Sequence, residues 1–210
     1  MKKNSIENRY IEVHNKMIHK HGYTSEALWG SKGSQFVRFK KISELFISKN
    51  GFSVLDFGCG LCDFYDYLSQ NNFTNIAYTG LEINPVFYTQ VCKEKPTSNI
   101  ILGNVDKLPL DLKWDYVIAS GIYNLGNSSK ENLDIFLEQF RELYERINIG
   151  FAVNFLSIYS DNPKNDSIYF DPTEVMNLCL KKFSKYIKLD QTYLPHDFTI
   201  FIYKNKQEIL

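Results

Sequence analysis

The segment VLDFGCGLCDF contains two groups of residues whose types and spacing can do chemistry. Cys59 and Cys62 have the C-x-x-C spacing of a dithiol redox site or of half a zinc site. Asp56, Gly58 and Gly60 form D-x-G-x-G, the pattern of a ligand-binding turn that joins a strand to a helix. The first interpretation uses two thiols, whereas the second uses a carboxylate and backbone N–H groups. The remainder of the sequence must decide between them.

The glycine turn favours a ligand that carries a positive charge. Glycines at positions 58 and 60 let the backbone approach a ligand without a Cβ in the way, and the helix that follows presents free N–H groups. The carboxylate of Asp56 would repel a pyrophosphate at this place. A dinucleotide fingerprint, G-x-G-x-x-G, needs its third glycine where this chain has Asp63. A nicotinamide or flavin enzyme is therefore disfavoured.

Polar residues also follow the other predicted strands. Glu82 ends the segment YTGLE, where an acidic side chain can accept hydrogen bonds from both hydroxyl groups of a ribose. The segment GNVDKLPL follows a third strand, and SGIYN follows a fourth. Because ligands of open α/β sheets bind at the carboxyl ends of the strands, we expect these segments to surround one ligand.

Together these segments resemble the class I S-adenosylmethionine (SAM)-dependent methyltransferases. The opening turn is similar to their motif I, D/E-x-G-x-G-x-G, with Cys62 in the place of the third glycine. The resemblance covers roughly residues 52–204 and implies SAM as the cofactor and S-adenosylhomocysteine (SAH) as its product. It implies cofactor contacts from the following core residues: Asp56, Phe57, Gly58, Cys59, Gly60, Glu82, Ile83, Asn104, Val105, Asp106 and Ser120, with Asp106 on the adenine amino group.

The thiol interpretation lacks the partners that it needs. Cys92 and Cys179 are isolated in predicted helices, and no paired Cys or His spacing completes four zinc ligands. A thioredoxin-like enzyme also places C-x-x-C at the start of a helix, but it does not require acidic residues at the neighbouring strand ends. We therefore expect Cys59 and Cys62 to be small residues of a tight loop, and we expect no metal.

The segments GYTSEALWGSKGSQFVRF, SGIYNL, NFLS and YLPHDFTIFIYK resemble a subset of these methyltransferases linked to bacterial surface-polysaccharide gene clusters. In that subset N-terminal helices fold over the cofactor. Gln35 and Arg38 share a helix face toward the sheet, where an arginine can hold the methionine carboxylate by paired hydrogen bonds; the alternative is a solvated arginine. Trp29, in the loop before this helix, can cover the adenosine or the acceptor, or can belong to the core.

The acceptor site is predicted at the ends of the fourth and fifth strands and at the last turn. A histidine beside Asp197 in LPHDF can act as a general base, although an anionic acceptor needs none. His14, His19 and His21 of the first helix are expected to face water, though one of them can line the acceptor entrance. The predicted acceptor-site residues are Tyr123, Asn124, Asn154, Tyr159 and His196.

The elements that must position these residues alternate between strand and helix after a helical N-terminus. Helices are predicted from Ser5 to Gly22 and from Ser34 to Gly51, followed by a buried strand at SVLDF and alternating elements up to a closing hairpin. This order predicts an α/β three-layer sandwich with a mostly parallel seven-stranded sheet and one antiparallel strand near an edge. We expect a single domain over residues 1–210, with a helical cap at 1–50 and a Rossmann-like core at 52–204.

Length and charge limit the class of partner. The 210 residues suit one domain, and 24 Lys plus Arg against 24 Asp plus Glu leave no basic surface for nucleic acid. Neither a signal peptide nor a membrane span is expected, so the protein is predicted to be cytoplasmic, with a small-molecule partner and no membrane insertion.

We therefore expect a SAM-dependent methyltransferase that acts on a small molecule. The resemblance implies O-methylation in surface-polysaccharide or capsule biosynthesis, with a nucleotide-activated sugar or a phosphoramidate-type acceptor. The alternatives are a non-catalytic SAM-binding protein and a thiol redox protein that uses Cys59 and Cys62.

Overall fold

The computed structural model describes the chain at residues 2–24 and 32–206. The predicted N-terminal cap is therefore described in two parts. Trp29, which lies between them, is outside the described residues.

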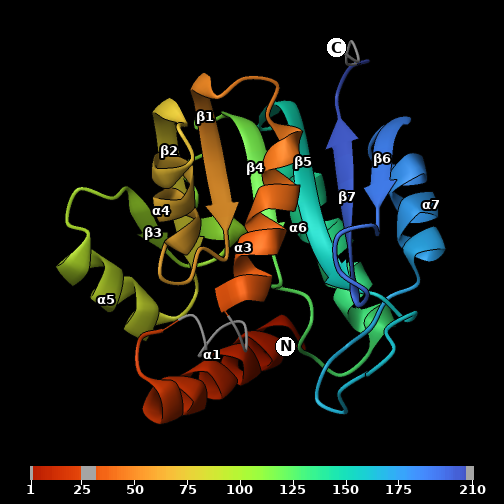
Figure 1. The fold of residues 1–210 in the computed structure, drawn as a ribbon, viewed down its shortest axis with the longest axis horizontal. Helices are drawn as coiled ribbons and strands as arrows, with labels where there is room; N and C mark the ends of the chain where they lie inside the picture. The colour runs from red at the N-terminus through yellow and green to blue at the C-terminus, as the bar shows by residue number, and fades with distance from the viewer. Residues whose placement is uncertain (1, 25–31, 207–210) are drawn as a thin grey trace.

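The described residues form a seven-stranded sheet in the order β3-β2-β1-β4-β5-β7-β6 (Figure 1). β7 pairs antiparallel with both β5 and β6, and the other neighbouring pairs are parallel. This confirms the predicted mostly parallel sheet with one antiparallel strand near an edge. The strands are β1 (Asn50–Phe57), β2 (Thr74–Glu82), β3 (Ile100–Leu102), β4 (Trp114–Ser120), β5 (Ile147–Leu156), β6 (Tyr186–Asp190) and β7 (Asp197–Tyr203).

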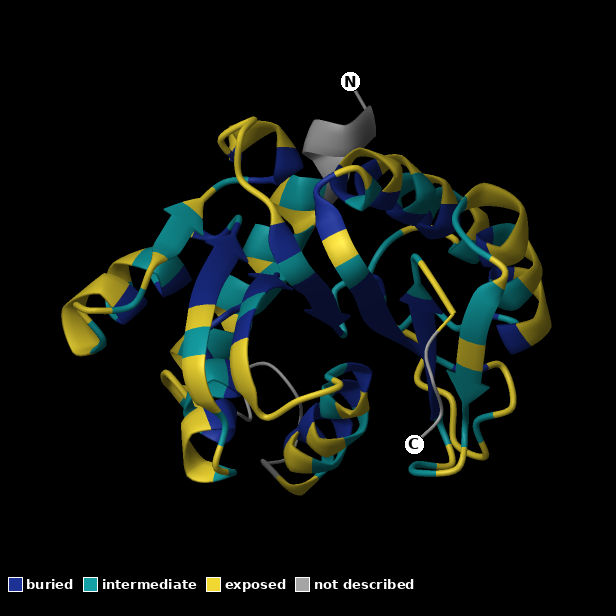
Figure 2. Ribbon diagram, turned by 90° about the horizontal axis from the view of Figure 1, so that it is seen from above, coloured by how far each residue is buried: buried dark blue, intermediate teal, exposed yellow. Residues whose placement is uncertain are grey.

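Helices cover both faces of the sheet, which gives the predicted three layers (Figure 2). One further helix, α1, lies across the carboxyl ends of the parallel strands (Figure 1). None of the described helices is long and apolar enough to span a bilayer. The helices are α1 (Lys2–His21), α3 (Lys32–Ile42), α4 (Asp63–Gln70), α5 (Pro85–Glu94), α6 (Ser129–Tyr144) and α7 (Pro172–Lys182), with short 3₁₀ turns η1 (Ser43–Leu45) and η2 (Val105–Lys107).

The strands bury side chains on both faces because each face carries a helical layer. In β1, Leu55 and Phe57 belong to the core beneath α6 and α7, whereas Val54 belongs to the core beneath α3 and α4. Phe155 of β5 is fully buried, and its ring lies 4.9 Å from that of Phe170 and 5.4 Å from that of Phe136.

Side chains cap the N-termini of α6 and α7. Ser128 accepts a hydrogen bond from the N–H of Glu131, and Asp171 accepts one from the N–H of Thr173. Both side chains therefore satisfy helix N–H groups that have no partner within the helix. Pro172 occupies the first helical position, where a missing N–H costs nothing.

The second predicted helix, from Ser34 to Gly51, is too long at its end. α3 ends at Ile42, and the backbone is already extended at Phe46. The ring of Phe46 lies 4.5 Å from that of Phe52 and 5.0 Å from that of Tyr116, so packing against the sheet overrides the helical periodicity.

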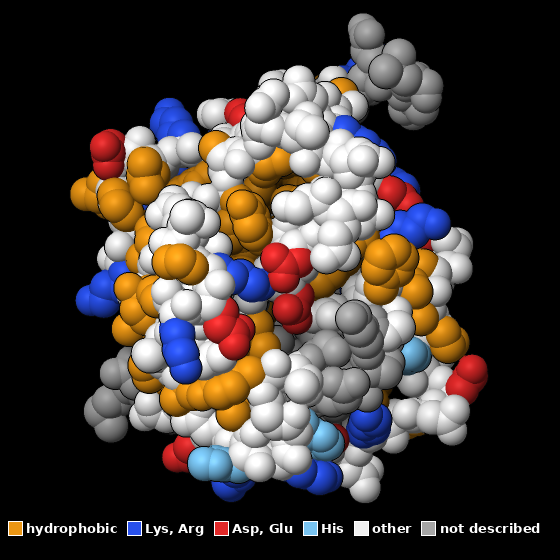
Figure 3. All heavy atoms as spheres, turned by 60° about the vertical axis from the view of Figure 1, so that its left-hand side comes forward, with side chains coloured by type: hydrophobic (Ala, Val, Ile, Leu, Met, Phe, Trp, Pro, Cys, Tyr) orange, Lys and Arg blue, Asp and Glu red, His pale blue; other side chains and the backbone are white. Residues whose placement is uncertain are grey.

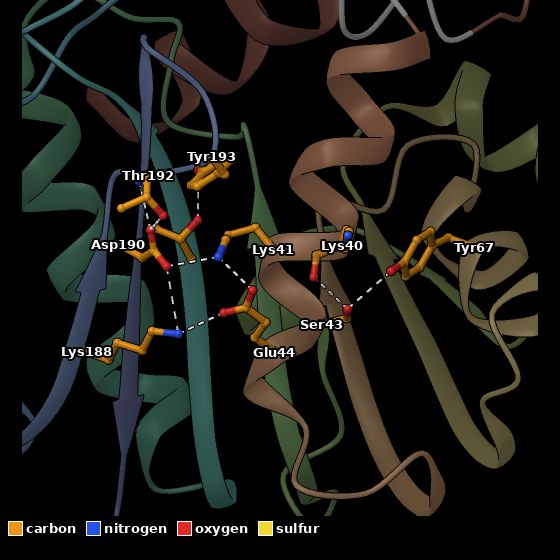
Figure 4. A network of polar contacts seen from close by, with 10 residues as sticks. Lys40, Lys41, Ser43, Glu44, Tyr67, Lys188, Asp190, Thr192 and Tyr193 are labelled. Atoms are coloured by element: carbon orange, nitrogen blue, oxygen red, sulfur yellow. Dashed lines mark hydrogen bonds and ion pairs between the residues drawn. The ribbon is translucent and has the colours of Figure 1, made fainter. Parts of the chain in front are cut away.

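Ion pairs attach the end of α3 to the β6 edge of the sheet (Figure 4). Lys41 Nζ lies 2.9 Å from Asp190 Oδ2, and Lys188 Nζ lies 2.8 Å from Glu44 Oε2. The pKa of Asp190 is lowered to about 2, because its hydrogen bonds to Thr192 and Lys41 outweigh its partial burial. These contacts fix α3 relative to the hairpin that carries the last predicted site residue.

We expect Phe155→Ala to lower the free energy of unfolding by about 3–5 kcal/mol, because it leaves a cavity among packed rings. Phe36→Ala is the matched control: its ring is 50% exposed, so its loss should cost less than about 1 kcal/mol. Urea unfolding followed by circular dichroism measures both values. Equal losses in the two variants would contradict the proposed position of the core.

Candidate active site

A cavity of about 700 Å³ opens at the carboxyl ends of β1, β2 and β4, and residues of α1 line its other side. The structure brings most of the predicted site residues to this cavity, although they come from distant parts of the sequence. The predicted residues that line it are Gln35, Arg38, Asp56, Phe57, Gly58, Cys59, Gly60, Glu82, Ile83, Asn104, Ser120, Tyr123, Asn124 and His196.

The turn after β1 depends on two glycines with positive φ, Gly58 at +77° and Gly60 at +55°. A Cβ on Gly58 would lie 2.3 Å from Cγ2 of Ile122, so no larger residue fits there. The N–H groups of Gly58 and Cys59 both donate to the carbonyl oxygen of Leu81. The turn is thereby held against the end of β2.

The two cysteines of this turn pack together inside the protein. Cys59 Sγ and Cys62 Sγ lie 3.6 Å apart as free thiols, and both residues are buried. Burial raises the pKa of Cys59 well above its usual value, with Cys62, Asp56 and Glu82 adding to the shift. A reactive redox cysteine needs the opposite shift, toward the thiolate.

Glu82 joins the β1 turn to the loop after β2. Its Oε2 accepts a hydrogen bond from Gly60 N at 2.8 Å, and its Oε1 accepts one from Asn84 N at 2.7 Å. Burial raises the pKa of Glu82, and these backbone hydrogen bonds partly oppose the rise. Each carboxylate oxygen has two lone pairs, so each can accept one further hydrogen bond from a ligand.

Asp56 is a buried carboxyl group in the wall of the same cavity. Burial raises its pKa to about 7; the hydroxyl group of Tyr78 opposes the rise by donating to Oδ2 at 2.7 Å, and the charges of Glu82 and Asp63 add to it. Asp56 therefore changes its charge near neutral pH.

The predicted residues of α3 are buried and have protein partners. Gln35 Nε2 donates to Asp63 Oδ2 at 2.7 Å. Arg38 Nη2 lies 2.6 Å from Oδ2 of the buried Asp197, and its Nη1 donates to Ser34 Oγ at 3.2 Å. The solvated alternative for Arg38 is thus excluded, and the guanidinium links α3 to the start of β7.

His196 lies in the turn just before β7, at the edge of the cavity. Its side chain is 37% exposed, and its Nε2 lies 3.6 Å from Asp197 Oδ2, the oxygen that also contacts Arg38. Burial raises the pKa of Asp197, while Arg38 and His196 oppose the rise. Arg38 and His196 therefore share one carboxylate.

Three predicted acceptor residues at the ends of β4 and β5 make structural hydrogen bonds. Asn154 donates to Ser120 Oγ at 2.9 Å and accepts from Gly121 N at 2.7 Å. Asn124 accepts at its side chain from Leu156 N at 3.2 Å. Tyr123 is buried, and its hydroxyl group donates to a glutamine of α6, Gln139, at 2.8 Å. These bonds fix the loop after β4 against its neighbours.

Four predicted residues do not line the cavity. Val105 is buried in the core, and Asn154 is fully buried with its amide bonded to Ser120 at the end of β4. Asp106 has a 59% exposed side chain beside Lys107, and Tyr159 is 63% exposed. Contacts from these residues to a ligand stay predictions.

Two groups of lining residues were missed by sequence reasoning. One is a face of α1, and its spacing along the helix was the available signal: Glu7, Tyr10, Ile11 and Met17. His14, which was expected to face water unless it lined the acceptor entrance, also lines the cavity; its ring lies 5.8 Å from that of Phe87, and burial lowers its pKa. The other group belongs to the segment after β5 and gave no signal beyond its polarity: Ser160, Asn162, Lys164, Asp166, Ser167 and Tyr169.

Acidic residues dominate the half of the cavity nearest β1 and β2. Glu7, Asp56, Asp63 and Glu82 line it, against Arg38 alone among the described lysines and arginines there. Such a wall suits a ligand with positive charge. Outside the cavity, charges of both signs alternate on the face seen in Figure 3, which shows no continuous basic patch.

Comparison with known sequences gives one related protein. The Mycobacterium tuberculosis protein named "Putative methyltransferase Rv1506c" is 29% identical over 163 residues, which are 73% of this chain and 93% of that protein. No protein-family model matches the chain.

Solved structures give a broader set of similar folds. A SAM-dependent methyltransferase from Archaeoglobus fulgidus has a TM-score of 0.62 at 14% identity, covering 85% of this chain and 97% of that one. The DhpI–SAH complex has a TM-score of 0.62 at 12% identity, with 94% and 96% covered. Magnesium protoporphyrin IX methyltransferase from Synechocystis PCC 6803, with bound SAH, has a TM-score of 0.59 at 11% identity, with 83% and 88% covered.

Two of these proteins carry SAH, and the fold agreement extends over nearly the whole of each. The order of elements, the glycine turn after β1 and the acidic end of β2 agree with the class that the sequence motifs predict. The chain has the fold of the class I SAM-dependent methyltransferases.

Proposed function

We propose that the protein transfers a methyl group from SAM to a small-molecule acceptor. The observation that carries the proposal is the acidic half of the cavity, where Asp56, Glu82 and the glycine turn meet at the carboxyl ends of β1 and β2. When bound, SAM supplies a methyl group on a positively charged sulfur. The acidic wall favours such a cation, whereas it would repel a nucleotide phosphate.

The residues of this half have separable proposed roles. Glu82 accepts the ribose hydroxyl groups on the lone pairs that Gly60 and Asn84 leave open. Asp56 attracts the amino group of the methionine part. Arg38 lines the cavity while it is paired with Asp197, and its positive charge attracts the methionine carboxylate.

The acceptor half of the cavity has a different lining. Ser160, Asn162, Ser167 and Tyr169 offer hydroxyl and amide groups, and Lys164 and Asp166 add one charge of each sign. Polar groups at this density suit an acceptor with several hydroxyl groups or with an anionic group. They support the polysaccharide or capsule role that the sequence resemblance implies, with a nucleotide-activated sugar or a phosphoramidate-type acceptor.

His196 is the proposed general base for a hydroxyl acceptor. Its imidazole would take the proton from the acceptor hydroxyl at a ring nitrogen as the oxygen bonds to the methyl carbon and the bond from that carbon to the sulfur of SAM breaks, which leaves SAH. Asp197 then stabilises the charged imidazolium at 3.6 Å. The segment after β5 is held beside His196, because Ser157 N donates to the carbonyl oxygen of His196 at 2.9 Å.

Glu82→Ala should weaken SAH binding by about 1–3 kcal/mol, because the variant loses hydrogen bonds to a charged group. Titration calorimetry measures the affinity, with Glu138→Ala as a control at an exposed carboxylate of α6. Wild-type protein that is folded but binds neither SAM nor SAH at millimolar concentration would refute the proposed function. Unchanged affinity in Glu82→Ala alone would refute only the ribose contact.

SAH affinity should rise by about tenfold between pH 6 and pH 8, because Asp56 with a pKa of about 7 is neutral at the lower pH and charged at the higher. Asp56→Asn should bind more weakly at pH 8 and should lose this rise. The variant also corrects for titration of the ligand's own amino group, which is common to both proteins. Identical pH profiles in the two proteins would exclude Asp56 as the group responsible.

With a hydroxyl acceptor, His196→Ala should lower turnover by roughly 10²–10⁴-fold, while SAH affinity stays unchanged. His19→Ala removes an exposed histidine of α1 and serves as the control. Transfer of a labelled methyl group from SAM to candidate nucleotide-activated sugars is the assay. Near-normal turnover in His196→Ala would dismiss the base and favour an acceptor that arrives as an anion.

A further inference from the structure

A chain of four polar side chains crosses the end of the cavity nearest β3. Tyr123 Oη donates to Gln139 Oε1 at 2.8 Å, and Gln139 Nε2 donates to Asn104 Oδ1 at 3.1 Å. Asn104 Nδ2 then donates to Glu7 Oε1. All four residues line the cavity, and the chain ends on a carboxylate that α1 contributes.

A backbone group fixes the direction of donation along this chain. Val105 N donates to Asn104 Oδ1 at 2.7 Å, and a backbone nitrogen can only donate. Asn104 must therefore turn its oxygen toward Val105 and its amide nitrogen toward Glu7. The group that the chain presents at α1 is consequently a hydrogen-bond acceptor held in place by an amide donor.

The order of strands places the purine of the cofactor at this end. If Glu82 at the end of β2 holds the ribose, the sulfur must lie toward β4 and β5, where the acceptor half and His196 are found. The purine then lies on the other side of the ribose, toward β3 and Asn104. Ile11, one turn from Glu7 in α1, and Ile135, one turn from Gln139 in α6, supply apolar surface for a flat ring.

We propose that Glu7 selects the purine of the cofactor by accepting a hydrogen bond from the 6-amino group of adenine, with Asn104 as the residue that positions it. The inference rests on the proposed function. A 6-oxo purine presents a carbonyl oxygen at this place, and two acceptors facing each other repel. The contact replaces the one that the sequence resemblance implies for Asp106, which does not line the cavity.

The test compares SAH with S-inosylhomocysteine, its 6-oxo analogue, by titration calorimetry on the whole chain. Wild-type protein should bind SAH at least about tenfold more tightly than the analogue. Glu7→Gln supplies an amide that can donate to the carbonyl oxygen, so the preference should fall by about tenfold. Glu7→Ala should weaken SAH binding without strengthening the binding of the analogue. Glu12→Gln makes the same charge change at an exposed site of α1 and should leave both affinities within about twofold.

The outcomes separate this inference from the proposed function. Absence of SAH binding by the wild-type protein would overturn the function itself. SAH binding with the same preference in Glu7→Gln as in the wild type would overturn only the role of Glu7. If Glu7→Gln and Glu7→Ala each lower the affinity for SAH and for the analogue by the same factor, the role of Glu7 is also overturned, because that pattern indicates a merely structural residue. Unfolding curves for each variant verify that the comparison is between folded proteins.

Discussion

The hydrogen bonds that Glu82 accepts connect the two loops on which the site depends. Its carboxylate receives N–H groups from Gly60 in the turn after β1 and from Asn84 in the loop after β2. Burying an unpaired carboxylate would cost several kcal/mol, so these bonds are required before Glu82 can remain charged inside the protein. The same bonds leave lone pairs directed at the cavity. Glu82 therefore holds the two loops together and also lines the cavity.

The N-terminal helices complete the site by different means. α3 is held at two points on one face of the sheet, by Gln35 with Asp63 of α4 and by Arg38 with Asp197 of β7, and its far end pairs with the β6 edge. Among the described residues, α1 reaches the rest of the protein through hydrogen bonds such as that from Tyr10 to the carbonyl oxygen of Leu125 at 2.8 Å and that from Asn104 to Glu7. α3 is thus attached to the sheet by ion pairs, and α1 is attached to the loops at the strand ends by hydrogen bonds.

The sequence alone predicts the sheet and the residues that gather at the ends of β1 and β2, because the signals there are local. Asp56, Gly58 and Glu82 sit at strand ends that hydrophobic patterning locates, and parallel strands bring their ends together. The predicted helix beyond Ile42 was wrong because the extended backbone at Phe46 depends on packing against a ring distant in the sequence, that of Tyr116. The residues of α1 were missed for a similar reason: a helix shows which residues share a face but not what that face covers.

Gly80 of β2 packs directly against the two cysteines of the turn after β1. A Cβ on Gly80 would lie 2.7 Å from Cys59 Sγ and 3.5 Å from Cys62 Sγ. Cys62 stands where the family motif usually has its third glycine, so the turn carries a sulfur atom at a place that is usually empty. On the neighbouring strand, the residue that faces the two sulfur atoms is a glycine, Gly80. A side chain can therefore be added at position 80 only if sulfur is removed from the turn, so natural variation at these positions should be coupled.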